Sequence, residues 1–107
     1  QAEISMEIDP GTFTLAQLQE YLSVGVNRFS LGVQAFQPEL LQACGRSHDV
    51  DDIWQAVELL RRANVTNFSV DLISRLPRQS LPQWQESLEK AVAIAPNHIS
   101  IYDLTIE

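Results

Sequence analysis

Three polar side chains, those of Glu7, Gln34 and Asp71, stand at or near the C-terminal ends of three segments in which apolar and polar residues alternate. Carboxylates accept hydrogen bonds from hydroxyl and ammonium groups, and an amide both donates and accepts. Ligands of α/β proteins bind at the C-terminal ends of parallel strands. The three side chains therefore predict one ligand site at this rim. The alternative is that each side chain caps a nearby backbone group.

The elements that must position these side chains alternate along the chain. Strands are predicted over residues 3–8, 28–34, 68–72 and 98–102. Helices are predicted from Thr14 to Gly25, over 37–44, from Asp49 to Asn64 and from Ser80 to Pro96. Thr14 and Ser80 each precede a glutamine by three residues, which is the spacing of a capping box. Alternating strands and helices indicate an α/β fold with a parallel sheet.

The two faces of this predicted sheet differ in polarity. One face is apolar and consists of Ile4, Met6, Ile8, Phe29, Leu31, Val33, Phe68, Val70, Leu72, Ile99 and Ile101. The other is small and polar and consists of Glu3, Ser5, Glu7, Ser30, Gly32, Gln34, Ser69, Asp71, His98, Ser100 and Tyr102. Right-handed crossovers put all helices over the apolar face. On the last helix, Trp84, Leu88, Ala91, Val92 and Ala95 are expected to face it.

The polar face also predicts the shape of the sheet. A closed eight-stranded barrel fills its interior with bulky apolar layers, and this chain has no such layer. We therefore expect a curved, incomplete barrel with four parallel strands, whose lumen holds a large polar ligand. The open edges of such a part-barrel expose strands that can pair, so we expect the isolated chain to dimerise or swap.

Composition narrows the class of protein. The chain has 107 residues, enough for one small domain over 1–107, and a net charge of −7. This charge argues against nucleic acid or anionic membranes as main partners. No apolar run reaches the roughly 18 residues of a membrane span. The single cysteine, Cys44, excludes an internal disulfide and any metal site of several thiolates. A cytoplasmic location is expected, and the missing initiator Met suggests a piece of a longer chain.

Several segments resemble one known family in order and spacing. They are residues 6–11 (MEIDPG), 26–34 (VNRFSLGVQ), 45–46 with 48–49 (GR and HD), 70–73 with 76–77 (VDLI and LP), and 98–107 (HISIYDLTIE). The family is that of the oxygen-independent coproporphyrinogen III oxidases and the related haem chaperones, both of them radical S-adenosylmethionine (SAM) proteins. The resemblance covers nearly the whole chain.

The resemblance implies a partial (β/α)6, TIM-like barrel of which this chain is a central fragment. It implies SAM and a 4Fe–4S cluster in the lumen. It also implies SAM contacts from Glu7 at one SAM, and from Gln34, Arg46 and Asp71 at a second SAM. No catalytic residue or metal ligand is expected here, because the family's C-x3-C-x2-C cluster motif would lie before this chain. Cys44 does not match that motif and is expected to be a buried helix residue.

The implied reaction is oxidative decarboxylation of propionate side chains to vinyl groups, started by a radical from reductive cleavage of SAM. The isolated fragment is not expected to be active. One alternative is a haem chaperone, which binds and transfers haem without this activity, and the segments 31–36 and 102–107 look more like that branch. A second is an unrelated (β/α)-barrel enzyme for a phosphorylated or sugar-like ligand, although no glycine-rich phosphate loop is present. His48 and His98 are expected to be structural instead of haem ligands.

One segment departs from the family pattern. The family usually has an aromatic–glycine pair before Leu-Pro and then Gly-Gln, whereas this chain has Ser74, Arg75 and Arg78. We expect the two arginines to face solvent, and the alternative is that they bind an anion.

Overall fold

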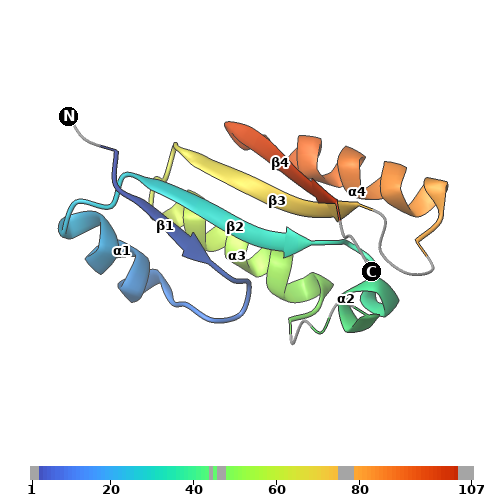
Figure 1. Ribbon diagram of the computed structural model, residues 1–107. Helices are drawn as coiled ribbons and strands as arrows, with labels where there is room; N and C mark the ends of the chain where they lie inside the picture. Colours follow the sequence, from blue (N-terminus) through green and yellow to red (C-terminus); the bar gives the residue numbers. More distant parts are fainter. Residues whose placement is uncertain (1–2, 44, 46–47, 75–78, 104–107) are drawn as a thin grey trace.

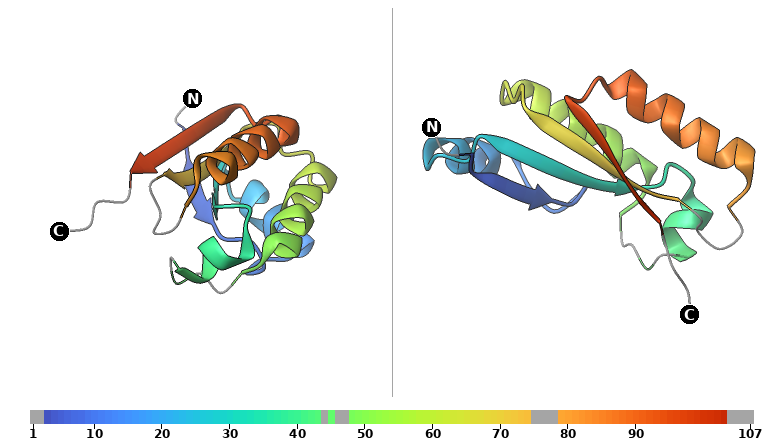
Figure 2. Two further views of the ribbon diagram at one scale, coloured as in Figure 1. Left: turned by 90° about the vertical axis from the view of Figure 1, so that its right-hand side faces the viewer. Right: turned by 45° about the horizontal axis from the view of Figure 1, so that its top comes forward.

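The computed structural model describes residues 3–43, 45, 48–74 and 79–103, and it has the expected α/β architecture (Figure 1). Its four strands form one parallel sheet whose spatial order follows the chain: β1 (Ser5–Ile8), β2 (Arg28–Gln34), β3 (Phe68–Ser74) and β4 (His98–Asp103). The helices between them are α1 (Leu15–Ser23), the short α2 (Pro38–Ala43), α3 (Val50–Arg62) and α4 (Leu81–Ile94). The helices α1, α3 and α4 lie on one side of the sheet (Figure 2). The other face stays open.

Each of the three longer helices begins at a residue that caps it. Thr14, Asp49 and Ser80 have extended backbones, and their side chains accept a hydrogen bond from the backbone N–H three residues later. The side chain at that position in turn accepts from the backbone N–H of the cap: Thr14 donates to Oε1 of Gln17 at 2.9 Å, and Ser80 donates to Oε1 of Gln83 at 2.9 Å. The capping boxes predicted at Thr14 and Ser80 are confirmed. They fix where each helix starts relative to the preceding strand.

The hydrophobic core lies between the sheet and the helices. Its fully buried side chains include Leu18, Phe29, Leu31, Val33, Ile53, Leu60, Val70, Leu72 and Ile94. The predicted apolar face is therefore confirmed on the two central strands. At the sheet edges it is confirmed for Ile8, Met6 and Ile99, which are buried or pack against the core. It is wrong for Ile4, which is 47% exposed, and for Ile101, which is 52% exposed. Each of these residues lies beside or in an edge strand, β1 or β4, which has a neighbouring strand on one side only.

The buried face predicted for the last helix is confirmed at Trp84, Leu88 and Ala91 and is wrong at Val92 and at the C-cap Ala95, both of which are exposed. Val92 is 66% exposed, whereas Ser87 and Ile94, seven residues apart on one helix face, are buried. A buried hydroxyl needs hydrogen-bond partners, and Ser87 has two. Its Oγ accepts from the backbone N–H of Phe36 at 3.4 Å and donates to Oε1 of Gln37 at 3.2 Å. Ser87 thus holds the segment that follows β2 against α4.

Some predictions fall on residues outside the described ranges. These residues are Cys44, Arg46, Arg75 and Arg78. None of the helices in the described ranges has the length and apolar composition that crossing a bilayer requires.

Candidate functional site

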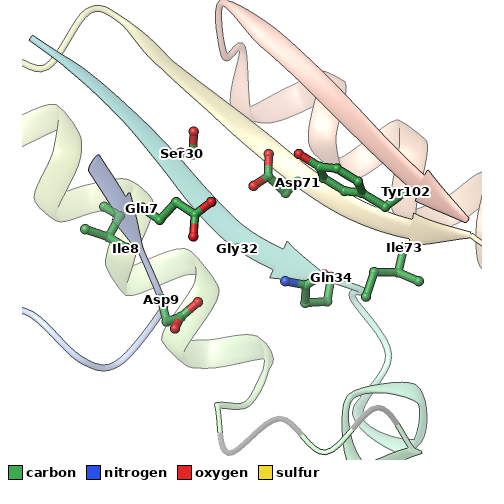
Figure 3. A pocket seen from close by; sticks show the side chains of 9 residues that line it. All are labelled: Glu7, Ile8, Asp9, Ser30, Gly32, Gln34, Asp71, Ile73 and Tyr102. Atoms are coloured by element: carbon green, nitrogen blue, oxygen red, sulfur yellow. The ribbon is translucent and has the colours of Figure 1, made fainter. Parts of the chain in front are cut away.

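A pocket of about 400 Å³ lies on the open face of the sheet (Figure 3). All four strands, and the residue that follows β1, contribute side chains to it. The lining residues are Glu7, Ile8, Asp9, Ser30, Gly32, Gln34, Asp71, Ile73 and Tyr102. Most of them alternate with core residues along their strands, so the same alternation builds the core and the pocket. The polar face of β2 is therefore the floor of a pocket.

The structure brings together three of the four predicted site residues. Glu7 from β1, Gln34 from β2 and Asp71 from β3 all line the pocket. Arg46, the fourth, lies outside the described residues. The sequence reasoning missed Asp9, because Asp-Pro-Gly indicates a turn. The signal that could have found it is its position directly after the end of β1.

Gly32 lies at the centre of the pocket, and its missing side chain makes room for two others. A Cβ added at Gly32 would lie 2.8 Å from Oδ1 of Asp9 and 3.2 Å from Nε2 of Gln34. The first distance is far shorter than a carbon–oxygen contact allows. The absence of a side chain at Gly32 therefore lets the Asp9 carboxylate and the Gln34 amide lie over this part of β2, and a larger residue would push them aside.

The backbone at Gln34 has an unusual conformation. Its φ is 71°, in the left-handed region that residues other than glycine rarely adopt. The backbone N–H of Ala35 donates to the carbonyl of Val33 at 2.9 Å, which makes Gln34 the centre of a γ-turn. The pairing of β2 with β3 shifts here, because Leu31 pairs with Val70 but Gln34 pairs with Leu72. Strained turns of this kind are concentrated at functional sites.

The N-terminal part of the same face is built from hydroxyl groups. Ser69 is buried, and its Oγ donates to Oγ of Ser30 at 3.2 Å. Ser30 and Ser69 are directly paired across β2 and β3. Small hydroxyl side chains that satisfy each other can line a polar surface without filling it. This pairing leaves the volume above the sheet open.

The carboxyl of Asp71 has a perturbed pKa. Burial raises the pKa of Asp71 above its ordinary value of 3.8, and the neighbouring Glu7 carboxylate raises it further. Arg28, His98 and a hydrogen bond with Ser69 act in the opposite direction. A bound cation beside Asp71 would remove the repulsion by Glu7 and stabilise the charged form. The electrostatics of the pocket therefore favour a ligand with positive charge.

The arrangement of the possible metal ligands can be compared with that of a metal site. No group of three histidine, cysteine, aspartate or glutamate side chains within the described ranges is arranged to hold a metal ion.

A second hollow, of about 380 Å³, is lined by Ser74, Gln79, Ser80, Leu81, Trp84 and Ile101. Of the residues that depart from the family pattern, Ser74 is described and lines this hollow.

The fold and the pocket define an α/β protein with an open, part-barrel sheet and a polar pocket at the strand ends. A sequence model described as "Radical SAM superfamily" matches residues 1–91. This chain therefore belongs to the radical SAM superfamily.

Individual relatives agree with this assignment. The chain is 56% identical over 106 residues to the haem chaperone HemW of Synechocystis sp., covering 99% of this chain and 26% of that protein. It is 33% identical over 101 residues to the oxygen-independent coproporphyrinogen III oxidase of Paracoccus denitrificans, covering 94% of this chain and 22% of that protein. The chain thus spans about a quarter of the length of these relatives.

A solved structure shows the same fold. The coproporphyrinogen III oxidase HemN from Escherichia coli, described as a radical SAM enzyme, superimposes with a TM-score of 0.86 at 31% sequence identity. The match covers 97% of this chain and 24% of that one. The four strands and their helices therefore correspond to a fragment of the radical SAM barrel.

Proposed function

We propose that this chain is a central part of the core domain of a longer radical SAM protein of haem or porphyrin metabolism, and that its pocket contacts SAM. The observation that carries the proposal is the convergence of Glu7, Gln34 and Asp71 on one pocket. Arg46 is proposed as a further contact. The relatives named above, all of them haem chaperones or coproporphyrinogen oxidases, support the class of substrate.

The pocket residues fit SAM chemically. SAM carries a sulfonium and an ammonium group, and the pocket presents the carboxylates of Glu7, Asp9 and Asp71. Carboxylates also accept hydrogen bonds from ribose hydroxyls, and the Gln34 amide can both donate and accept. Burial, and then the Glu7 carboxylate, raise the pKa of Asp71 despite the opposing effects of Arg28, His98 and Ser69, and a cationic ligand would stabilise the charged form further.

A 4Fe–4S cluster, when bound, supplies the electron that cleaves SAM reductively. We propose that its ligands lie outside this chain, whose only cysteine is Cys44. The residues described here would bind and orient SAM. None of them is proposed to transfer a proton or an electron.

Two activities fit this site. The first is that of a coproporphyrinogen III oxidase, which is supported by the 31% identical oxidase structure. The second is that of a haem chaperone, which is supported by the 56% identity to a protein of that name. Haem, or a porphyrinogen, would be the partner besides SAM. A cytoplasmic location stays a prediction from the sequence.

The experiment uses the full-length protein, reconstituted anaerobically with iron and sulfide. SAM binding is measured first by titration, in the wild type and in Glu7→Gln. The protein then receives SAM, a reductant and coproporphyrinogen III, and protoporphyrinogen IX is measured by chromatography. Product identifies the oxidase. A protein that cleaves SAM and binds haem but forms no product is the chaperone. Absence of SAM binding by a protein with an intact cluster would refute the proposal.

A further inference from the structure

The γ-turn at Gln34 depends on one carbonyl oxygen, that of Val33. It accepts the N–H of Ala35 at 2.9 Å and lies 3.1 Å from Nε2 of His48. A carbonyl can only accept, so Nε2 of His48 carries a hydrogen and donates it. All three residues are buried, and His48 is 7% exposed. Neither bond is replaced easily by water, so each contributes to holding the turn.

The register of the sheet explains why a side chain can bond to this carbonyl. Within the described pairing of β2 with β3, Leu31 and Gln34 have partners, but Gly32 and Val33 have none. Residues at such an irregularity are left out of the regular ladder. The buried Val33 carbonyl has two lone pairs, and beside the Ala35 N–H it can accept a second donor. His48 supplies one from a segment 15 residues further along the chain.

The position of His48 is fixed from its other side by α3. The next residue, Asp49, caps this helix, and its Oδ1 accepts from the N–H of Asp52 at 3.0 Å. Oδ2 of Asp52 in turn accepts from the backbone N–H of Asp49, also at 3.0 Å. His48 therefore links a rigid helix start to the end of β2. On the pocket side, Gly32 leaves room for the Gln34 amide.

We propose that His48 is a positioning residue for Gln34: its bond to the Val33 carbonyl holds the strained turn that presents the Gln34 amide to the pocket. This inference rests on the proposed function, because Gln34 is taken to contact SAM. His48 does not itself line the pocket. Its role is to limit the conformations of the turn before the ligand binds. This reduces the conformational entropy that is lost on binding.

The test uses the full-length reconstituted protein with three variants, His48→Leu, His48→Gln and Gln34→Ala. SAM affinity is measured by calorimetric titration, and deuterium uptake is measured in peptides that contain Ala35. His48→Leu removes the donor. We expect it to weaken SAM binding about fivefold or more and to speed exchange at the Ala35 amide. His48→Gln keeps an N–H of similar reach, and we expect it to recover most of the affinity and the slow exchange.

A double-mutant cycle separates positioning from a general loss of stability. If His48 acts through Gln34, His48→Leu weakens binding little or not at all once Gln34 is alanine. Equal losses in both backgrounds, or unchanged exchange at Ala35 in His48→Leu, would overturn the inference. If His48→Leu does not fold, His48→Asn serves instead, because its amide is too short to reach the Val33 carbonyl.

Failure of the proposed function would give a different result. A wild-type protein that binds no SAM refutes the proposed function, and exchange at Ala35 still decides whether His48 holds the turn. A third result would separate the two. If the wild type binds SAM and Gln34→Ala weakens this binding, the proposed function stands. If His48→Leu then changes neither SAM affinity nor exchange at Ala35, the role of His48 is refuted.

Discussion

The carboxyl groups of Glu7 and Asp71 face one pocket from β1 and β3, with β2 between them, and the charge of Glu7 raises the pKa of Asp71 (Figure 3). Burial of Asp71 is the larger cause of the shift. Two carboxylates that share a pocket without a cation repel each other, and this repulsion costs stability. A positively charged ligand in this pocket would reduce the repulsion.

Glu7→Gln should lower the pKa of Asp71 toward 3.8, because it removes the repulsion but keeps the burial. Titration followed by NMR at the Asp71 carboxyl carbon measures this. The matched control is Glu58→Gln, on the exposed side of α3, which should leave the pKa of Asp71 unchanged. A pKa that does not move in Glu7→Gln would contradict the coupling of the two groups.

The raised pKa of Asp71 also sets the pH dependence of stability. The folded state binds the Asp71 proton more tightly than the unfolded chain does, so the stabilisation is complete below the ordinary value of 3.8 and is lost as pH rises through the folded pKa. At pH 7 the ionised carboxyl therefore destabilises the fold. Asp71→Asn should raise the free energy of unfolding in urea at pH 7 by a small amount, since the pocket is open to solvent. The gain should shrink toward pH 4.

The same substitution should have the opposite effect on function. A hydrogen bond to a charged group contributes about 1.5–3 kcal/mol, so Asp71→Asn should weaken SAM binding by roughly ten- to a hundredfold. Titration of the full-length protein with SAM measures this. Asp51→Asn, on the exposed first turn of α3, is the control and should bind SAM normally. Unchanged affinity in Asp71→Asn would exclude a cofactor contact at this position.

Gly32→Ala should weaken SAM binding and change stability little. The added Cβ would meet the side-chain ends of Asp9 and Gln34 at 2.8 and 3.2 Å, and these side chains would have to move aside into the space that the ligand needs. Thermal unfolding and SAM titration measure the two effects. Gly25→Ala is the control, because Gly25 has a φ of 105° and its nearest contact is Ile4, outside the pocket. It should lose stability through backbone strain and keep the SAM affinity of the wild type.

The isolated 107-residue chain should self-associate through an edge of its sheet. β1 and β4 are the edge strands, and Ile101 and Tyr102 of β4 are more than half exposed. The net charge of −7 opposes association, so added salt should favour it. Sedimentation velocity at low and high salt measures this. Ile101→Lys should reduce association, whereas Val92→Lys, on the exposed face of α4, should not. A monomer at all salt concentrations would contradict the prediction.

Much of this fold can be predicted because local signals agree with the tertiary structure. Thr14 and Ser80 mark helix starts through side chains that bond to their own backbone, which needs no knowledge of distant residues. The alternation along β2 separates core from pocket because the strand has a period of two. Glu7, Gln34 and Asp71 gather at one rim because parallel strands end at the same edge.

The parts that could not be predicted depend on contacts between distant segments. The positive φ of Gln34 is held by His48, 15 residues beyond Val33, and nothing in the local sequence indicates it. On α4, burial of Ser87 in place of Val92 depends on partners at Phe36 and Gln37. Contacts with distant residues determine the backbone at Gln34 and the buried face of α4. The periodicity of the local sequence does not reveal such contacts.

The order of the strands has a consequence for synthesis. Each strand pairs with the one made before it, because the sheet runs β1-β2-β3-β4 from one edge to the other. A chain that leaves the ribosome from its N-terminus can therefore add each strand to an existing edge without rearranging earlier pairs. At every stage the sheet has two unpaired edges, β1 and the newest strand. The edge of β1 therefore stays open from the start of synthesis, whereas each later edge is covered by the strand made next.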